Sequence, residues 1–265
     1  MNKRLIALLL AVFMMCTVFC GCRKVEYDPG DKGQVNTGLT YETADINVRR
    51  MADNIDTWII DISLYKDNPA TTFNYCITDL DQNGRLEMLT TVGYSNVTDI
   101  KCYEVNEDLN GLVLVENVTD TGSHADVNDL NDGTCYKDAE TGRIYYMYMD
   151  ERSEQDDSTG AVNKYSSKIA LSLFEGKLYQ ECLATKGIIR TSGEAEIVYT
   201  DGAGNVITEE EYNNAVETRF GAMEKKTATM KWKGCTAANH SKNINLASND
   251  LIILLSDSFE QFKIQ

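Results

Sequence analysis

Short runs rich in Tyr, Val, Ile and Thr alternate with clusters of Asp, Asn and Gly from Phe73 to about Gly187. Runs of this length, bounded by turn-forming residues, are typical of strands. The links at Glu140–Arg143 and Glu175–Lys177 have the length of tight hairpins, and they are far too short for parallel crossovers. The pattern predicts an antiparallel meander whose strands are FNYCITD, LEMLTTVGY, DIKCYEV, GLVLVENV, GTCYKD, RIYYMYMD, KYSSKIALSLFEG and KLYQECLATKG.

Apolar residues spaced three and four apart predict a helix before this region and two helices after it. The first helix is stopped by Asn68-Pro69, and its apolar face comprises Met51, Ile55, Trp58, Ile59 and Ile62. Core packing is the expected role of Trp58.

The second helix begins at a capping box formed by Thr208 and Glu211, and its apolar stripe comprises Tyr212, Val216 and Phe220. The segment ATMKW then predicts another strand. The third helix is expected over 248–264, with apolar residues at 251, 252, 255, 259 and 262.

These elements predict one α+β domain over 41–265, built mainly from an antiparallel β meander. The meander would form a sheet or a partial barrel or propeller-like arrangement, with an N-terminal helix, one inserted helix and a C-terminal helix. The chain has no internal repeat with a steady period, which argues against a complete propeller.

The first residues predict export rather than fold. Lys3 and Arg4 precede an apolar run from Leu5 to Phe19 that only Thr17 interrupts. A short basic start and an apolar stretch of roughly 7–15 residues are the marks of a secretion signal. The run is marginal for a spanning helix, which needs about 20 apolar residues.

The run ends in VFCGC, and this junction resembles the lipobox of bacterial lipoproteins, in which a small residue precedes the lipidated Cys. Phe19 and Cys20 depart from the usual Leu and Ala or Ser. The resemblance implies a signal peptide over 1–22, lipidation of Cys22, and anchoring in the cell membrane on its extracytoplasmic face. An ordinary signal peptide cut nearby and an uncleaved anchor are the alternatives.

Residues 23–40 are polar, contain three of the 18 Gly and one of the two Pro, and have no apolar period. They are expected to form a flexible tether. As a coil of about 18 residues, such a tether has ends roughly 25 Å apart, which would lift a domain off the membrane surface.

The balance of charge argues against nucleic acid as a partner. Without Lys3 and Arg4, 23 basic residues face 41 acidic ones, a formal charge of −18. Binding a phosphate backbone requires clustered Lys and Arg. The membrane, through the lipid anchor, and an extracellular ligand or protein are the expected partners.

Five of the eight Cys remain beyond the leader, and no two of them form a CxxC pair, so a zinc site or a thioredoxin-like motif is poorly supported. Buried thiols are expected for Cys76 and Cys102, which lie in strand-like runs. The pairing cannot be deduced from spacing; the five are Cys76, Cys102, Cys135, Cys182 and Cys235.

The stretch DLDQNGRLE carries the clearest chemistry. Calcium takes six to eight oxygen ligands, and a short loop supplies them best from alternate positions. Gly84, at the sixth position, permits the positive φ that turns the chain back. The candidate ligands are Asp79, Asp81, Asn83, the backbone carbonyl of Arg85, and Glu87.

The first six residues of this stretch match an EF-hand loop, but Thr90 occupies the position where the EF-hand needs a Glu, and the flanks are β-like. The stretch more closely resembles the DxDxDGxxD loops of FG-GAP and VCBS-type repeats and the DxDxNGxxEL element of exported proteins of Gram-positive anaerobes. The resemblance implies a Ca²⁺ site between two strands, with the same five ligands. A solvated hairpin tip is the alternative.

Other candidates are weaker. The segment 120–133 contains four Asp and His124 at irregular spacing, and an acidic surface loop is favoured there over a second ion site. TDGAGN lacks the P-loop Lys and is expected to be a hairpin or helix lead-in. ERSEQDDSTG is expected to be a solvated or disordered loop. The run RIYYMYMD is expected to expose alternate Tyr residues and could contribute half of a binding face.

No sequence motif nominates a catalytic centre. The two His, His124 and His240, form no HExxH motif, and no GxSxG elbow appears. The sequence predicts a non-enzymatic, lipid-anchored surface protein of a Gram-positive bacterium with a calcium-stabilised β domain, which binds a polymer or a protein outside the cell. The alternative is an exported, glycosidase-like hydrolase with dispersed carboxylates.

Overall fold

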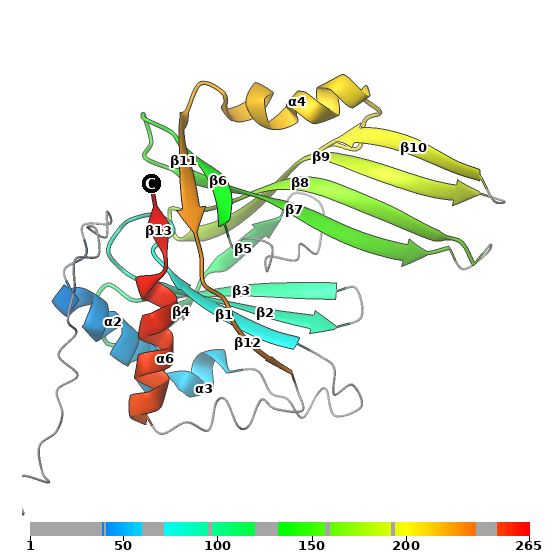
Figure 1. Cartoon of the computed structure of the whole chain (residues 1–265). Coiled ribbons are helices and arrows are strands. Elements are labelled where there is room, and N and C mark those ends of the chain that lie inside the picture. The colour runs from blue at the N-terminus through cyan, green and yellow to red at the C-terminus, as the bar shows by residue number, and fades with distance from the viewer. Residues whose placement is uncertain are drawn as a thin grey trace, which may run out of the picture. The chain divides into compact units, whose positions relative to one another are not determined.

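Hairpins join most of the strands into two β-sheets (Figure 1). The computed structural model describes residues 39, 41–59, 72–94, 97–119, 132–156, 160–191, 194–236 and 248–265. All of these belong to one compact unit, Val35–Gln265. The predicted signal peptide, Cys22 and all of the predicted tether except Leu39 lie outside the described residues.

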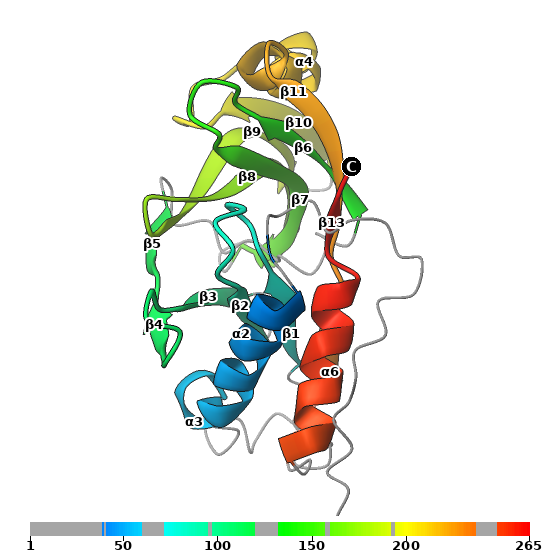
Figure 2. The same ribbon diagram turned by 90° about the vertical axis from the view of Figure 1, so that its left-hand side faces the viewer.

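The smaller sheet contains five strands of the described chain, and their neighbours are antiparallel throughout. Its order is β12 (Lys233–Thr236), β1 (Thr72–Thr78), β2 (Glu87–Tyr94), β3 (Val97–Val105) and β4 (Leu112–Leu114). Three helices accompany it: α2 (Tyr41–Asp53), α3 (Ile55–Trp58) and α6 (Ser248–Glu260). Helices α2 and α6 pack against each other, α6 contacts β1, and α2 contacts β3 (Figure 2).

The larger sheet contains eight strands of the described chain. Its order is β10 (Glu194–Asp201), β9 (Lys177–Thr191), β8 (Val162–Phe174), β7 (Ile144–Gln155), β6 (Asp132–Lys137), β11 (Glu224–Thr229) and β13 (Lys263–Ile264), and β5 (Glu116–Thr119) pairs with β9 away from this path. Helix α4 (Glu209–Phe220) packs against β9 and β10.

One core runs through the unit and joins residues of both sheets with residues of α2 and α6. Trp58 is buried in it, as predicted, and the indole Nε1 donates to the backbone oxygen of Met51 at 2.8 Å. A second, smaller cluster lies under α4, where Phe220 packs on Tyr136 and Tyr145 with ring centroids 5.5 and 4.8 Å apart.

The α+β, β-rich prediction is confirmed, and the sheets do not close into a barrel. The two predicted hairpin turns are present: Glu175 and Gly176 have φ of 50° and 71°, and Gly142 has φ of 74°. The capping box of α4 is also confirmed, because Thr208 accepts the amide of Glu211 while the Glu211 carboxylate accepts the amide of Thr208.

The meander prediction is wrong in one respect. The run GLVLVENV is divided at Val115 into β4 and β5, and β5 pairs with β9 in parallel. The chain therefore leaves the smaller sheet and enters the larger one at this point. The buried side chain of Val115, in the core shared by the two sheets, marks the crossing.

Three boundaries also differ. The first predicted helix is interrupted at Asn54, whose side-chain amide donates to the carbonyl of Arg50 at 2.8 Å, and Ile62 lies outside the described residues. The segment ATMKW is mostly a link, because β11 ends at Thr229 and β12 begins in the other sheet. The last helix ends at Glu260, and β13 follows it.

Two surface predictions are wrong. The tyrosines of RIYYMYMD are buried on both faces of β7: Tyr145 lies against α4, whereas Tyr146 and Tyr148 belong to the main core. No Tyr face is left for a ligand there. The segment ERSEQDDSTG is not a loop at its start, because residues 151–155 continue β7 and pair with β8.

The buried-thiol prediction is confirmed for Cys76 and Cys102, which are fully buried and free. Burial raises the pKa of Cys76 to about 12. Burial likewise raises the pKa of Cys135, also a free thiol, to about 11. Raised pKa values keep these buried thiols protonated, which disfavours a nucleophilic role.

Candidate metal centre

The loop between β1 and β2 brings three acidic side chains together. Thr78 on β1 and Glu87 on β2 form the last cross-strand pair before the loop. Asp79 is therefore the first residue of the loop, and Glu87 is the first residue of β2 after it. Two left-handed residues reverse the chain between them: Gly84, as predicted, with φ of 86°, and Gln82 with φ of 58°. The connection is therefore a compact β loop, without the flanking helices of an EF-hand.

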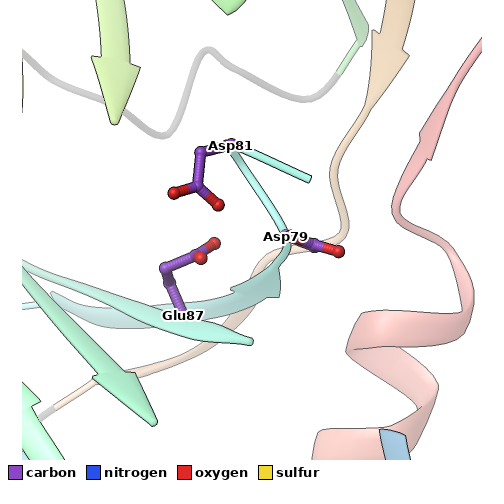
Figure 3. Close-up of side chains that lie close together, drawn as sticks. All are labelled: Asp79, Asp81 and Glu87. Carbon is purple, nitrogen blue, oxygen red and sulfur yellow. The ribbon is translucent and has the colours of Figure 1, made fainter. Parts of the chain in front are cut away.

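One carboxylate oxygen from each of Asp79, Asp81 and Glu87 lies within 4.8 Å of the other two. Asp79 and Glu87 are fully buried, and Asp81 is half-buried. In Figure 3 the carboxylates of Asp81 and Glu87 face each other, and that of Asp79 turns to the side at the end of β1. The structure thus brings together three of the five predicted ligands.

Glu87 has the most unusual environment of the three. Its Oε2 accepts the amide of Leu80 at 2.7 Å and the hydroxyl of Thr78 at 3.1 Å. Its Oε1 is also buried, and no donor from the described part of the chain hydrogen-bonds to it. A buried charged oxygen without a partner is costly, because the protein has not replaced the hydration that the oxygen loses on folding.

Electrostatics add to this cost. Burial, followed by the nearby charges of Asp79 and Asp81, raises the pKa of Glu87 well above its ordinary value. Burial is also the largest cause that raises the pKa of Asp81, and the charge of Glu104 adds to it. Both shifts have the direction expected where negative charge is concentrated without enough positive charge.

A fourth carboxylate next to the cluster already has a counter-charge. Glu104 on β3 is the cross-strand partner of Glu87, and its Oε1 accepts Nη2 and Nε of Arg85 at 2.7 and 3.0 Å. The side-chain amide of Asn83 donates to the same oxygen at 2.7 Å. Glu104 therefore orients Arg85 and Asn83 at the rim of the cluster.

The other two predicted ligands are Asn83 and the backbone carbonyl of Arg85. The Oδ1 of Asn83 accepts the backbone amide of Arg85 at 2.7 Å, while its amide group also donates to Oδ2 of Asp81 at 3.0 Å. Its oxygen is thus engaged within the loop in this structure. Arg85 makes its described contacts through its side chain and its backbone amide. Its backbone carbonyl therefore stays a predicted ligand.

Residues far away in sequence hold the loop in place. The hydroxyl of Tyr146, on β7 of the larger sheet, donates to the carbonyl of Leu80 at 2.7 Å. The amide of Leu86 donates to Oδ1 of Asn47, on α2, at 3.1 Å. The loop is therefore fixed to a helix and to the other sheet, and Lys137 on β6 adds a 3.0 Å hydrogen bond to Gln82 Oε1.

Sequence reasoning missed Glu104, Asn47 and Tyr146. The alternation in DIKCYEV indicates a strand, but nothing local specifies that Glu104 pairs with Glu87. Residues 120–131, which are most of the second candidate ion segment and include His124, lie outside the described residues. His240 lies outside them as well. The predicted turn at TDGAGN is confirmed, because Asp201 and Asn205 close it and Thr200 bridges to Val206.

The arrangement consists of hard oxygen donors on a tight loop, which suits Ca²⁺ or Mg²⁺ better than the softer transition metals. Among the described helices, none is long and apolar enough to cross a membrane. No protein-family model matches the chain, and neither the curated proteins nor the solved structures contain a significant match.

Proposed function

We propose that this chain is a non-enzymatic surface protein, lipid-anchored at Cys22 on the extracytoplasmic face of the membrane, in which Ca²⁺ binds the β1–β2 loop and stabilises the fold. Its candidate ligand is a polymer or a protein outside the cell. Asp79, Asp81 and Glu87 would hold the ion, with Asn83 and the carbonyl of Arg85 completing the ligand set.

The single observation that carries the calcium proposal is the buried Oε1 of Glu87, which no described donor satisfies. This oxygen lies within a carboxylate cluster whose ligand atoms are at most 4.8 Å apart. A turn without an ion would gain nothing from burying such an oxygen, since exposure to water would satisfy it. A divalent cation would satisfy it and offset the repulsion among the three charges.

The position of the loop supports a structural role for the ion. The loop contacts α2 through Asn47 and the larger sheet through Tyr146. An ion that fixes the loop would therefore also stabilise the attachment of these elements to the smaller sheet. Extracellular calcium modules bind with dissociation constants of about 10⁻⁴–10⁻³ M, which suits the exterior of a cell.

The acids that line the cavity described below support a binding rather than a hydrolytic role. Glu181 accepts Nε of Arg219 at 2.9 Å. Asp201 accepts three donors of its own turn, and these hydrogen bonds lower its pKa. A glycosidase needs one carboxyl group with a raised pKa to donate a proton, and Asp201 is shifted in the opposite direction.

Thermal unfolding of the purified chain tests the calcium proposal. At 100 times the dissociation constant, one site contributes about 2.7 kcal/mol, and a chain of this size then gains about 5–10 °C in Tm. The double variant Asp79→Ala, Asp81→Ala should lose this gain in Ca²⁺ and change little in chelator. Equal shifts of the variant under both conditions would show that the loop is a turn and not an ion site.

The anchor is tested separately by metabolic labelling with a clickable palmitate. The wild-type chain should incorporate the label in the membrane fraction, and Cys22→Ala should not. Cys20→Ala is the matched control, because it removes a neighbouring thiol without removing the proposed acceptor. Label that persists in Cys22→Ala rejects the lipid anchor and leaves the calcium proposal unaffected.

A further inference from the structure

A cavity of about 760 Å³ opens on the larger sheet, apart from the acidic loop. Its floor crosses the far parts of β7, β8, β9 and β10, and the turn after β10 forms one side. The volume lies within the range of small-molecule sites, about 300–1,000 Å³. Polar and apolar surface contribute about equally to its lining, whose polar side chains include Arg152, Tyr165, Ser167, Thr185, Thr200 and the acids Glu181 and Asp201.

Strand register places three hydroxyl groups in one row on the cavity floor. Thr200 pairs with Thr185, and Thr185 pairs with Ser167. Directly paired residues project from the same face of a sheet, so the three side chains lie side by side. The oxygens of Ser167 and Thr185 are 2.8 Å apart, and a pair of hydroxyls that shares one hydrogen keeps further capacity to donate and accept.

The turn at one side is built to lie close to the floor. A Cβ at Gly202 would be 2.0 Å from the carbonyl oxygen of Cys182 on β9. Only glycine therefore allows the turn to fold so near to this strand. The adjacent Asp201 is held by hydrogen bonds to its own turn, which fix the position of this rim.

Arg152 supplies the positive charge of the cavity. Its guanidinium lies over the ring of Tyr165, 5.1 Å from the centroid, which restricts its orientation. Its Nε is buried and makes no hydrogen bond to the described chain. A carboxylate oxygen of the half-exposed Glu154 is 3.5 Å from Nε, a contact too long to satisfy this donor well.

We infer that this cavity is a binding site for a small ligand that carries one carboxylate and several hydroxyl groups, as in a uronic acid. The Arg152 guanidinium would bind the carboxylate, because its fork of donors matches the two carboxylate oxygens. The hydroxyl row would exchange hydrogen bonds with the hydroxyls of the ligand. The strongly acidic chain, with net charge −16, disfavours polyanions, which limits the ligand to few negative charges.

Calorimetric titration of the purified chain with glucuronate tests this inference, and glucose serves as the neutral probe. Glucuronate should bind with a millimolar dissociation constant or better, and glucose should bind at least about tenfold more weakly, since it lacks the group that Arg152 recognises. Arg152→Gln should weaken glucuronate binding by about tenfold or more. Arg49→Gln, an equal charge change on the exposed face of α2, should bind like the wild type.

Three results would overturn the inference. They are no heat of binding at glucuronate concentrations up to about 10 mM, equal affinity for glucuronate and glucose, or unchanged glucuronate affinity in Arg152→Gln. Tm and circular dichroism check that the variant folds. If it does not fold, Arg152→Lys replaces it; Lys retains the charge and lacks the planar fork, so binding should still weaken. Unchanged affinity in that variant also rejects the site. Ser167→Ala should weaken binding several-fold through the hydroxyl row.

Discussion

Two loops of this molecule use the same kinds of residues and create opposite electrostatic conditions. The turn after β10, residues 201–205, has one Asp, two Gly and one Asn, and its carboxylate accepts three hydrogen bonds from the turn itself. The loop 79–87 also combines Asp, Asn and Gly, but it brings three carboxylates together and buries two of them completely.

The difference appears in the pKa values. Hydrogen bonds from the turn lower the pKa of Asp201, which is half-buried. Burial and neighbouring negative charges raise the pKa of Glu87 well above its ordinary value. In the first loop the carboxylate stabilises a turn. In the second, Gln82 and Gly84 reverse the chain, and Asp81 and Asp79 accept loop amides from Asn83 and Gly84. The buried Oε1 of Glu87 receives no donor from the described residues. Composition alone does not distinguish these cases, whereas the convergence and burial of the acids do.

The largest expected effect comes from changing one acid in each loop. Glu87→Gln should abolish the Ca²⁺-induced rise of about 5–10 °C in Tm, because it removes the charge of a fully buried ligand. In chelator its Tm should equal or exceed that of the wild type, since the amide is neutral and donates to the remaining carboxylates. Differential scanning calorimetry with Ca²⁺ and with chelator measures both values.

Asp201→Asn is the matched control, because it makes the same acid-to-amide change in the other loop. Its Ca²⁺-induced rise should equal that of the wild type, while its Tm is slightly lower under both conditions. A rise that disappears in Asp201→Asn, or persists in Glu87→Gln, would contradict the distinction between the two loops.

The next effect concerns the anchoring of the acidic loop. Tyr146→Phe removes the hydroxyl that donates to the carbonyl of Leu80 at 2.7 Å inside the core. Losing a hydrogen bond of this kind costs about 1–3 kcal/mol, so Tm should fall by about 2–10 °C. Calcium affinity should fall as well, because the loop is less well ordered before binding. Tyr148→Phe is the control: this Tyr is also buried on β7, and its hydroxyl donates to Oε1 of Gln180 on β9 at 3.3 Å.

A fall in stability with unchanged calcium affinity would show that Tyr146 supports the core without ordering the ion loop. Chemical denaturation in chelator gives the free energy of unfolding, and titration with Ca²⁺ gives the affinity. The two measurements together separate the contribution to folding from the contribution to the site.

The sequence predicts the parts of the site that are local. Alternate spacing places Asp79 and Asp81 on the same loop, and Gly84 marks the residue that needs a positive φ. It does not predict Glu104 or Tyr146, because strand register and the packing of one sheet on another depend on contacts far away in the chain.

The same limit explains the wrong prediction for the Tyr-rich strand. Alternation in a strand indicates one buried and one exposed face only when the sheet is covered on a single side. Strand β7 is covered on both sides, by α4 at Tyr145 and by the main core at Tyr146. The positions of α4 and of the smaller sheet decide this burial, and neither is encoded in the eight residues of the run.

The smallest effect is expected at an exposed acid, Glu211, which caps α4 shortly after the turn 201–205. Hydrogen bonds from the amide and hydroxyl of Thr208 lower its pKa below the ordinary value of 4.5. A carboxylate with a lowered folded-state pKa contributes stability at pH values above its unfolded pKa, and this contribution is lost as the pH falls through the folded-state pKa. Glu211→Gln should therefore have a slightly lower Tm than the wild type at pH 7, and the two should converge in acid. Glu210→Gln, in the same first turn and outside the capping box, controls for the loss of charge near the helix N-terminus. The difference in Tm between the wild type and Glu211→Gln could instead persist undiminished at pH values below the folded-state pKa. That result would mean that the capping hydrogen bonds do not depend on the charge of Glu211. The contrast with Glu87 would then rest on burial alone.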